Sequence, residues 1–541
     1  MAKQKLNCTN PESLIYSNEL LKLTVLGGIK LEGLDRMRAT LKVELINTSV
    51  PSVRHNLDLY NDNQTEKLIR RTAEKLEIGT SMIAASLAEL TGQLEEYRMN
   101  QIKENQPKPY EPPRLSNDER KAAETFLQSE NSLERTNELI GQSGVVGEEV
   151  NRLIMFLIFT SRKRSQPLHI VSLGSSGTGK THLQEKVGEL IPEEDRIEIT
   201  TLSENAFYYF GQRELKNKLI LIEDLDGAES VLYPLRELQS KKRISKTIAH
   251  KNTKGETRTI HLVVEGPVSV SGCTTQEYIY EDNANRSFLI YLDESKEQDK
   301  RIMEYQRRAS AGKINETEEQ EAKALLQNCQ RLLEPIKVIN PYAELLNIPE
   351  EVLKPRRTNN HYLQFIEAVT FYHQHQRELK ADENGEAYIE TTLEDIESAN
   401  RLLKEILLRK SDELTGACRN YLESVKSYLE QEGKKQFSNQ EIRKALKINQ
   451  SNQKRYNLSL INNYYIKKVK GKTGTAYQYE IVSYEEFQQL RNHIANVLDQ
   501  NLEKLTSSRN QFTSSEPVQK GSELVKPKKT KKIADQSGKT I

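Results

Sequence analysis

The segment 174–181, GSSGTGKT, is the feature that most constrains what this 541-residue chain can fold into. It fills every specified position of the pattern G-x-x-x-x-G-K-[ST], and it lies between the apolar run 169–173 (HIVSL) and a predicted helix that begins near Lys180. The glycines allow the backbone to wrap closely around a β-phosphate, with successive N–H groups and the helix N-terminus directed at it. The pattern therefore predicts a loop that binds the phosphates of ATP.

Two side chains of this loop have expected parts in the chemistry. The Lys180 ammonium would reach the β- and γ-phosphates, and the Thr181 hydroxyl would be a ligand of Mg²⁺. The predicted ATP-binding residues are Gly174, Ser175, Ser176, Gly177, Thr178, Gly179, Lys180, Thr181 and His182.

An acidic cluster follows the next apolar run, 219–222 (LILI), where the chain continues as Glu223-Asp224-Leu225-Asp226. One carboxylate at such a strand end holds the Mg²⁺ shell, and its neighbour orients or activates the attacking water. The usual order is Asp then Glu, whereas here Glu223 precedes Asp224, so the assignment of roles stays open and Asp226 could replace either. Thr181, Glu223 and Asp224 are the predicted Mg²⁺ ligands, and Lys180, Glu223 and Asp224 are predicted to be catalytic.

Two further positions fit an ATPase of the AAA+ type. Thr274 and Thr275 end an apolar strand, where such proteins carry a sensor for the γ-phosphate or the lytic water; a simple turn is the alternative. Arg286 precedes the run 288–292, where an arginine acting on a neighbouring subunit's nucleotide would lie; a surface arginine is the alternative.

The apolar runs 169–173, 219–222, 267–271 and 288–292 alternate with helical segments, which favours a parallel sheet covered on both faces. We therefore predict an α/β fold with an AAA+-like P-loop core over 117–315 and a helical lid over 316–412. A Pro-rich linker, 101–116, separates this core from an α+β unit, 1–100, with two or three strands over 23–45 and helices over 65–97.

Two regions are predicted to contact DNA. A basic hairpin over 244–264 would follow a nucleic-acid backbone, or would be a solvated edge protected by its lysines. The unit 416–485, with Ser438 and Glu441 as a capping box, follows a helix–turn–helix–hairpin pattern typical of a winged helix that binds DNA or protein. The candidate DNA-binding residues are Lys246, His250, Lys251, Lys254, Lys454, Arg455, Lys470 and Lys472.

Composition excludes several classes of protein. With 79 Lys and Arg against 78 Asp and Glu, the chain is not a uniformly basic nucleic-acid coat. Its four cysteines are scattered, which argues against a disulfide framework and a zinc finger. Because it has no apolar run of membrane-spanning length and no signal core, we expect a cytoplasmic protein; the Lys-rich stretch 505–541 is predicted to be disordered.

These residues resemble the helicase-like portion of toprim-type primase replication proteins carried by bacterial mobile elements. The similar stretches are LGGIKLEGLDRMRATLKVEL, RHNLDLYN, LEEYR, GSSGTGKT, LILIEDLDGAE, GCTT, NRSFLIYLDES and the block 356–377. The zinc-finger and toprim patterns that usually precede this segment are not seen here, so the resemblance implies a stand-alone helicase half without primer synthesis. The hairpin is similar to that of ring helicases of the minichromosome-maintenance and superfamily III group.

The leading functional hypothesis is an ATP-driven DNA helicase or translocase that acts as a ring, expected to be hexameric, on single-stranded and duplex DNA, with a separate primase as a further partner. A helicase loader or a transposition or replication regulator, which binds DNA without unwinding it, is the alternative. A DNA-binding protein whose nucleotide site is purely structural is a third reading, and the intact phosphate loop argues against it.

Overall fold

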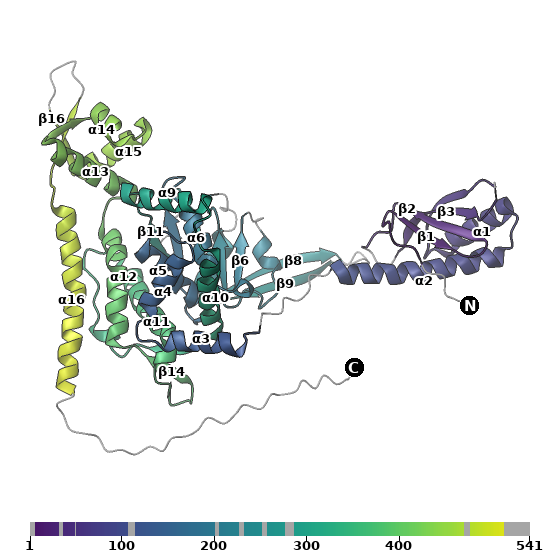
Figure 1. The fold of residues 1–541 in the computed structure, drawn as a ribbon, viewed down its shortest axis with the longest axis horizontal. Helices are drawn as coiled ribbons and strands as arrows, with labels where there is room; N and C mark the ends of the chain where they lie inside the picture. Colours follow the sequence, from purple (N-terminus) through teal and green to yellow (C-terminus); the bar gives the residue numbers. More distant parts are fainter. Residues whose placement is uncertain are drawn as a thin grey trace. The chain divides into compact units, whose positions relative to one another are not determined.

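The computed structural model describes residues 6–31, 36–48, 50–105, 114–200, 205–226, 232–251, 257–275, 286–469 and 477–512. The chain divides into two compact units, Met1–Pro112 and Pro113–Ile541. Figure 1 shows the elements of each unit along the chain.

The first unit is a four-stranded antiparallel sheet in the order β1-β2-β3-β4, packed against two helices. Its elements are β1 (Ser13–Ser17), β2 (Leu21–Leu26), β3 (Arg38–Leu45), β4 (Val53–Asp58), α1 (Asp62–Leu76) and α2 (Thr80–Asn105). Alternate residues of β3 are buried, which is the period of a sheet with one covered face. The predicted two or three strands over 23–45 miss β1 and β4. After β2, Gly28 adopts a positive φ of 64°, and a Cβ at this position would lie 2.6 Å from the Pro11 carbonyl oxygen, so that only glycine fits.

The second unit is built on a five-stranded parallel sheet in the order β11-β5-β10-β7-β6. Its strands are β5 (His169–Leu173), β6 (Arg196–Ile199), β7 (Lys218–Ile222), β10 (Val268–Thr274) and β11 (Phe288–Tyr291). Four of them fall on the predicted apolar runs, and β6 was not predicted. The α/β class with a parallel sheet is therefore confirmed.

Helices cover both faces of this sheet, as its continuous apolar strands require. On one face, Ile170 and Leu221 share a core with α5 (Glu149–Thr160), α6 (Lys180–Gly188) and the helices that follow β11. On the other face, Val171 and Ile220 share a second core with α7 (Leu232–Lys241) and the base of a hairpin. This hairpin, β8 (Arg243–Lys251) and β9 (Thr257–Glu265), matches the predicted one, and its tip 252–256 lies outside the described residues.

Further helices complete the second unit around this sheet (Figure 1). They are α3 (Asn117–Gln128), α4 (Ser132–Gln142), α9 (Lys296–Ser310), α10 (Glu316–Leu332), α11 (Pro355–Tyr372) and α12 (Leu393–Ser411). The predicted lid is not wholly helical, because β12 (Lys337–Ile339), β13 (Lys380–Ala381) and β14 (Ala387–Glu390) form a small sheet within it.

The winged-helix pattern is present after the lid. Its elements are α13 (Gly416–Glu432), β15 (Gln436–Ser438), α14 (Asn439–Leu446), α15 (Gln450–Asn462), β16 (Ile466–Val469) and β17 (Gln478–Ile481). The predicted capping box forms, since Glu441 N donates to Ser438 Oγ at 3.3 Å and Ser438 N donates to a Glu441 carboxylate oxygen at 3.4 Å. The last helix, α16 (Glu486–Phe512), packs against α12 and corrects the prediction of disorder from residue 505 as far as Phe512. The domain boundaries inside the second unit stay predictions.

Among the described helices, none combines the length and the apolar character that crossing a membrane requires.

Candidate functional site

The phosphate loop connects the buried strand β5 to α6, as the sequence predicts. Gly177 and Gly179 have φ values of +87° and +91°, in the left-handed region that strains residues with a Cβ. The helix begins at Lys180, so its first unpaired N–H groups lie at the end of the loop. These features build a concave, donor-rich turn of the kind that holds a phosphate.

The Lys180 side chain is held by hydrogen bonds to backbone carbonyl groups of the phosphate loop. The side chain is only 7% exposed, and Nζ donates to the carbonyl oxygens of Gly174 at 2.9 Å and Ser175 at 2.6 Å. Because the ammonium is compact and carries three donors, it can exchange these carbonyl partners for phosphate oxygens without moving the helix. The position of the Lys180 ammonium therefore suits its predicted contact with the β- and γ-phosphates.

The two predicted carboxylates follow β7, the second strand from the loop-bearing strand β5. Glu223 Oε1 accepts a hydrogen bond from the Thr200 hydroxyl at 3.1 Å, and Asp224 Oδ1 accepts one from the backbone N–H of Asp226 at 2.8 Å. Parallel strands bring their carboxyl ends to one edge of a sheet, and the carboxylates therefore face the phosphate loop across a cleft of about 410 Å³. The cleft is lined by Ser176, Gly177, Gly179, Lys180, Thr181, His182, Glu223, Asp224, Cys273, Thr274 and Thr275.

Asp226, the open alternative to either carboxylate, has a different environment. It accepts hydrogen bonds from the Thr274 hydroxyl, from the Thr275 N–H at 3.0 Å and from the Thr275 hydroxyl at 2.7 Å. Both of its oxygens are thus engaged with the end of β10. In this structure Asp226 therefore holds the two candidate sensor threonines at the cleft.

Sequence reasoning missed Gln184, one helical turn after Lys180. This side chain is 1% exposed and joins three elements of the site. Its Nε2 donates to the Ile222 carbonyl at the end of β7 at 3.1 Å, and its Oε1 accepts from the Ser271 hydroxyl of β10 at 2.7 Å. Nothing in the sequence marks a glutamine in the middle of a helix as important, apart from its spacing on the face that turns toward the sheet.

The cleft also contains Cys273, whose Sγ lies 3.6 Å from the same Gln184 oxygen. Burial raises the pKa of this thiol to about 12, which keeps it protonated at neutral pH.

The oxygen donors present fit Mg²⁺ held together with a nucleotide. Thr181, Glu223 and Asp224 offer one hydroxyl and two carboxylates on the same cleft. Within the described part of the chain, no cluster of three or more His, Cys, Asp or Glu side chains forms a metal site. A small set of protein ligands is what Mg²⁺ needs when phosphates and water complete its shell.

Arg286 lies at the opposite edge of the sheet. It precedes β11, which pairs in parallel with β5 so that Phe288 lies opposite Ile170, near the start of β5. Its Nε donates to the Ser240 hydroxyl at 2.9 Å, at the end of α7. Arg286 is therefore separated from the phosphate loop of its own chain by the length of a strand, and its action on a neighbouring subunit stays a prediction.

The basic hairpin leaves the sheet at this same edge, because only two residues separate the end of β9 from the start of β10. Lys246, in β8, donates to the Asn205 side chain and lies over the ring of Tyr208. His250 and Lys251 fall within β8, but their side chains, like the whole of Lys254, lie outside what the structure describes.

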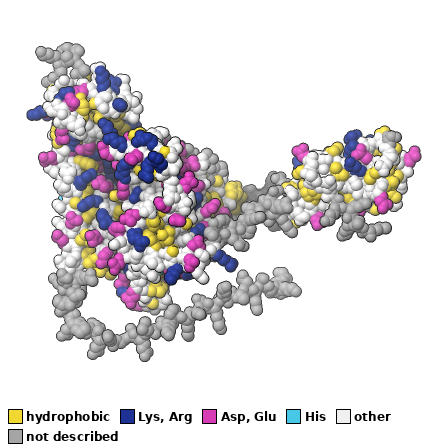
Figure 2. Space-filling view, in the orientation of Figure 1, with side chains coloured by type: hydrophobic (Ala, Val, Ile, Leu, Met, Phe, Trp, Pro, Cys, Tyr) yellow, Lys and Arg dark blue, Asp and Glu magenta, His cyan; other side chains and the backbone are white. Residues whose placement is uncertain are grey.

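The winged helix presents Lys454 and Arg455 on the exposed face of α15. The Arg455 guanidinium lies 5.2 Å from the centroid of the Tyr456 ring. The wing residues Lys470 and Lys472 lie outside the described residues. On the face shown in Figure 2, Lys and Arg side chains gather over this region and over α9.

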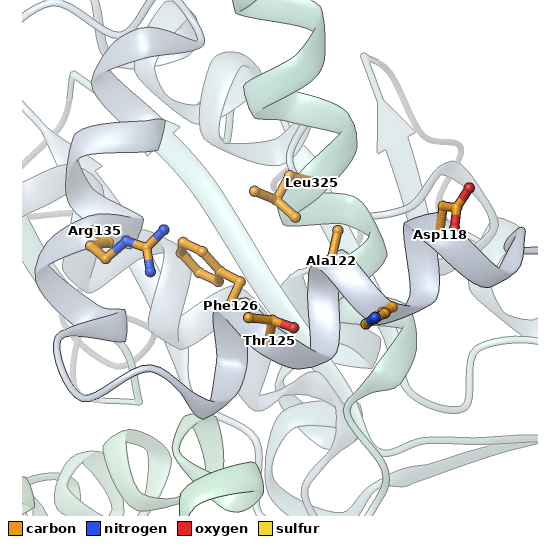
Figure 3. Close-up of a pocket in the computed structure, with 7 residues that line it drawn as sticks. Asp118, Ala122, Thr125, Phe126, Arg135 and Leu325 are labelled. Carbon is orange, nitrogen blue, oxygen red and sulfur yellow. The ribbon is translucent and has the colours of Figure 1, made fainter.

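A second concavity, of about 400 Å³, lies between α3, α4 and α10 (Figure 3). Phe126 and Leu325 give it an apolar floor, and the Arg135 guanidinium lies 4.9 Å from the Phe126 ring centroid. It contains no residue of the phosphate loop or the acidic cluster, so it does not belong to the nucleotide cleft.

A family model described as the MTBMA_p00010 P-loop domain matches residues 116–334, from the start of α3 to just beyond α10. This match, together with the sheet and its phosphate loop, confirms the predicted α/β P-loop fold, which implies nucleotide binding, typically with Mg²⁺; the AAA+-like character of this fold stays a prediction. A search of curated proteins finds no match.

Three solved structures are similar to this chain at low identity. A full-length MCM homolog from Methanopyrus kandleri is 11% identical, with a TM-score of 0.35, over 75% of this chain and 76% of that one. The SCCmec type IV Cch active helicase is 10% identical, with a TM-score of 0.26, over 90% and 99%. Drosophila ORC bound to DNA is 12% identical, with a TM-score of 0.22, over 75% and 99%. TM-scores below 0.5 do not establish a shared overall fold.

Proposed function

We propose that this protein is an ATP-dependent DNA helicase or translocase that serves the replication of a mobile element. The observation that carries the proposal is the cleft at the carboxyl edge of the sheet, where Lys180, Thr181, Glu223 and Asp224 converge. Hydrolysis of ATP requires these functions together: a cation on the β- and γ-phosphates, ligands for Mg²⁺, and a carboxylate that orients water.

In this proposal each residue of the cleft has one task. The loop N–H groups and Lys180 bind and orient the triphosphate, while Thr181 and one of the acidic pair hold Mg²⁺. When bound, Mg²⁺ neutralises charge on the β- and γ-phosphate oxygens. The other carboxylate accepts a hydrogen bond from the attacking water and aligns it with the γ-phosphorus. Asp226 keeps Thr274 and Thr275 at the cleft, where one of the two hydroxyl groups would form a hydrogen bond with the γ-phosphate.

We propose that the residues at the opposite edge of the sheet, the amino ends of its strands, contact the neighbouring subunit and the DNA. There Arg286 would complete the nucleotide site of the next subunit in a ring, expected to be a hexamer, and the hairpin β8–β9 would contact single-stranded DNA. The cations of α15 would bind duplex DNA. The support for this arrangement is that a nucleotide cleft at one edge and cations at the other suit subunits stacked head to tail.

The test is steady-state ATP hydrolysis by the full chain, with and without single-stranded DNA, followed by unwinding of forked duplexes. Lys180→Ala should reduce the rate by roughly 10²- to 10³-fold, since it removes the charge that stabilises the transferred phosphoryl group. Lys186→Ala, a partly exposed lysine of the same helix, is the matched control and should leave the rate unchanged.

The outcomes separate the candidate functions. A Lys180-dependent rate that rises several-fold with DNA, together with strand separation, supports a helicase. A Lys180-dependent rate that is indifferent to DNA, with no strand separation, would support the loader or regulator instead. Absence of hydrolysis with DNA present would contradict the proposal.

A further inference from the structure

Aromatic side chains border the base of the basic hairpin. The short helix η3 (Ala206–Tyr209) packs against both strands of the hairpin and buries Phe207, while Tyr208 is half-buried against the same core and Tyr209 is exposed. Tyr209 is 66% exposed, and Tyr233 at the start of α7 is 60% exposed. Large exposed aromatic rings on a folded surface are typical of binding sites.

Tyr208 and Tyr233 each lie beside a cation. Lys246 Nζ is 5.4 Å from the centroid of the Tyr208 ring, and the Arg236 guanidinium is 6.0 Å from that of Tyr233. Tyr208 and Tyr233 are also electrostatic neighbours: partial burial, with Tyr233 and Glu237 nearby, raises the pKa of Tyr208. The two rings therefore belong to one surface, although they come from segments 25 positions apart in the sequence.

The charge of this surface is positive where it meets the hairpin. Glu237, the acidic neighbour of Tyr208, forms an ion pair with Lys241 at 2.5 Å. Lys242 and Arg243 follow directly and lead into β8. An anionic polymer that binds to the hairpin would thus also contact the exposed tyrosine rings and the cations beside them.

We propose that the exposed rings of Tyr209 and Tyr233, beside the half-buried Tyr208, form a stacking platform for the bases of single-stranded nucleic acid, with Lys246 contacting the adjacent phosphate. The inference rests on the proposed function and adds a second mode of contact to it. Stacking on aromatic rings is worth about 1–3 kcal/mol per base and tolerates any sequence, because every base has a π-face. A motor that moves along arbitrary sequences needs that property.

A polypeptide ligand is the competing reading of exposed tyrosines. The cations favour nucleic acid, because Lys246 and Arg236 lie beside the rings and Lys242 and Arg243 extend the positive charge into the hairpin. Aromatic rings interleaved with lysines match a strand in which bases alternate with phosphates.

The experiment compares two oligonucleotides of equal length and charge, a 20-mer of deoxythymidine and a 20-mer of abasic sites, in fluorescence anisotropy with the full chain. Wild type should bind the thymidine oligomer at least about 10-fold more tightly, as expected if one base stacks. Tyr209→Ala/Tyr233→Ala should bring this ratio close to one, while Tyr209→Phe/Tyr233→Phe should keep it. Lys246→Ala should weaken binding of both oligomers equally.

Two contrary outcomes have different meanings. If wild type binds neither oligomer, the platform and the proposed function are both overturned. If wild type binds both oligomers with equal affinity, or if the preference for bases survives in the double alanine variant, the platform is overturned and the proposed function stands. The phenylalanine variant protects the test against misfolding, because it keeps the ring and its packing.

Discussion

The two edges of the five-stranded sheet carry opposite chemistry. The carboxyl edge holds the glycine-rich loop, the acidic pair and the two threonines, all within one cleft. The amino edge holds Arg286 and the base of the basic hairpin. The first edge is built from the ends of several packed strands, whereas the second projects on a two-stranded ribbon.

The difference fits what each edge is proposed to hold. Phosphate and Mg²⁺ chemistry requires side chains fixed to within a fraction of an ångström, which a set of buried parallel strands supplies. Binding of nucleic acid of any sequence requires instead a positively charged surface that extends from the domain, and a basic two-stranded hairpin supplies one. Four variants and one mixing experiment test this division of labour, in order of decreasing effect.

The largest effect is expected from Arg286→Ala. This residue lies at the amino edge of one subunit, and its loss should reduce ATP hydrolysis in the nucleotide cleft of the neighbouring subunit. Hydrolysis should fall by roughly 10³-fold with nucleotide affinity near that of wild type, because a cation on the transition-state charge is lost. Rates and nucleotide binding measured side by side would check this. Ser240→Ala removes the partner that Arg286 contacts within its own chain and should have little effect.

Mixing variants tests the action between subunits. An equal mixture of Arg286→Ala and Lys180→Ala chains contains interfaces with an intact loop on one side and an intact arginine on the other, roughly a quarter of the total. Such mixtures should regain activity that neither variant has alone. Failure to regain it would place Arg286 outside the catalytic machinery, and the two edges would then be independent.

Asp226→Asn should reduce hydrolysis by roughly 10- to 100-fold, the range seen when a group that orients a metal site is changed. The amide keeps the shape of the side chain but cannot accept all the hydrogen bonds from Thr274 and Thr275. Steady-state rates at saturating ATP would measure the loss. A rate equal to that of wild type would show that the threonines need no support from Asp226.

Gln184→Leu should lower the free energy of unfolding by about 1–3 kcal/mol, because it leaves the Ile222 carbonyl and the Ser271 hydroxyl buried without their partner. Denaturant unfolding of the variant and wild type would measure this. Gln184→Leu/Ser271→Ala should recover part of the loss. An unchanged midpoint in the single variant would mean that the bridge between α6, β7 and β10 contributes nothing.

The smallest effect is expected from Lys246→Ala at the hairpin. Removing one phosphate contact should lower the slope of log affinity against log salt by about 0.7 for single-stranded DNA. Basal hydrolysis should stay unchanged, because the hairpin lies away from the cleft. Lys300→Ala, an exposed lysine on α9, is the control. An unaltered salt slope in Lys246→Ala would remove this lysine from the DNA interface.

Much of the cleft was predictable from the sequence, because its residues follow long apolar strands and a full phosphate-loop pattern. Strand β6 was missed since its sequence, RIEI, alternates charged with apolar residues and is short. Gln184 was missed because a side chain that bridges elements far apart in sequence carries no local signal. Helix α16 had a signal that was overlooked: Leu490, Ile494, Leu498 and Leu505 lie near helical spacing and pack into the main core.

One strand, β10, connects the two edges, because it begins beside the hairpin and ends at the cleft. Only Gly266 and Pro267 stand between β9 and β10, and hydrogen bonds fix this junction from Gly266 N to Lys242 O at 2.7 Å and from Asn217 N to Pro267 O at 2.8 Å. Strand β10 then runs for seven residues, about 23 Å, to the threonines of the cleft. In the proposed motor, this two-residue junction would couple the hairpin directly to the strand that ends at the nucleotide cleft, so that the hairpin would move together with its subunit.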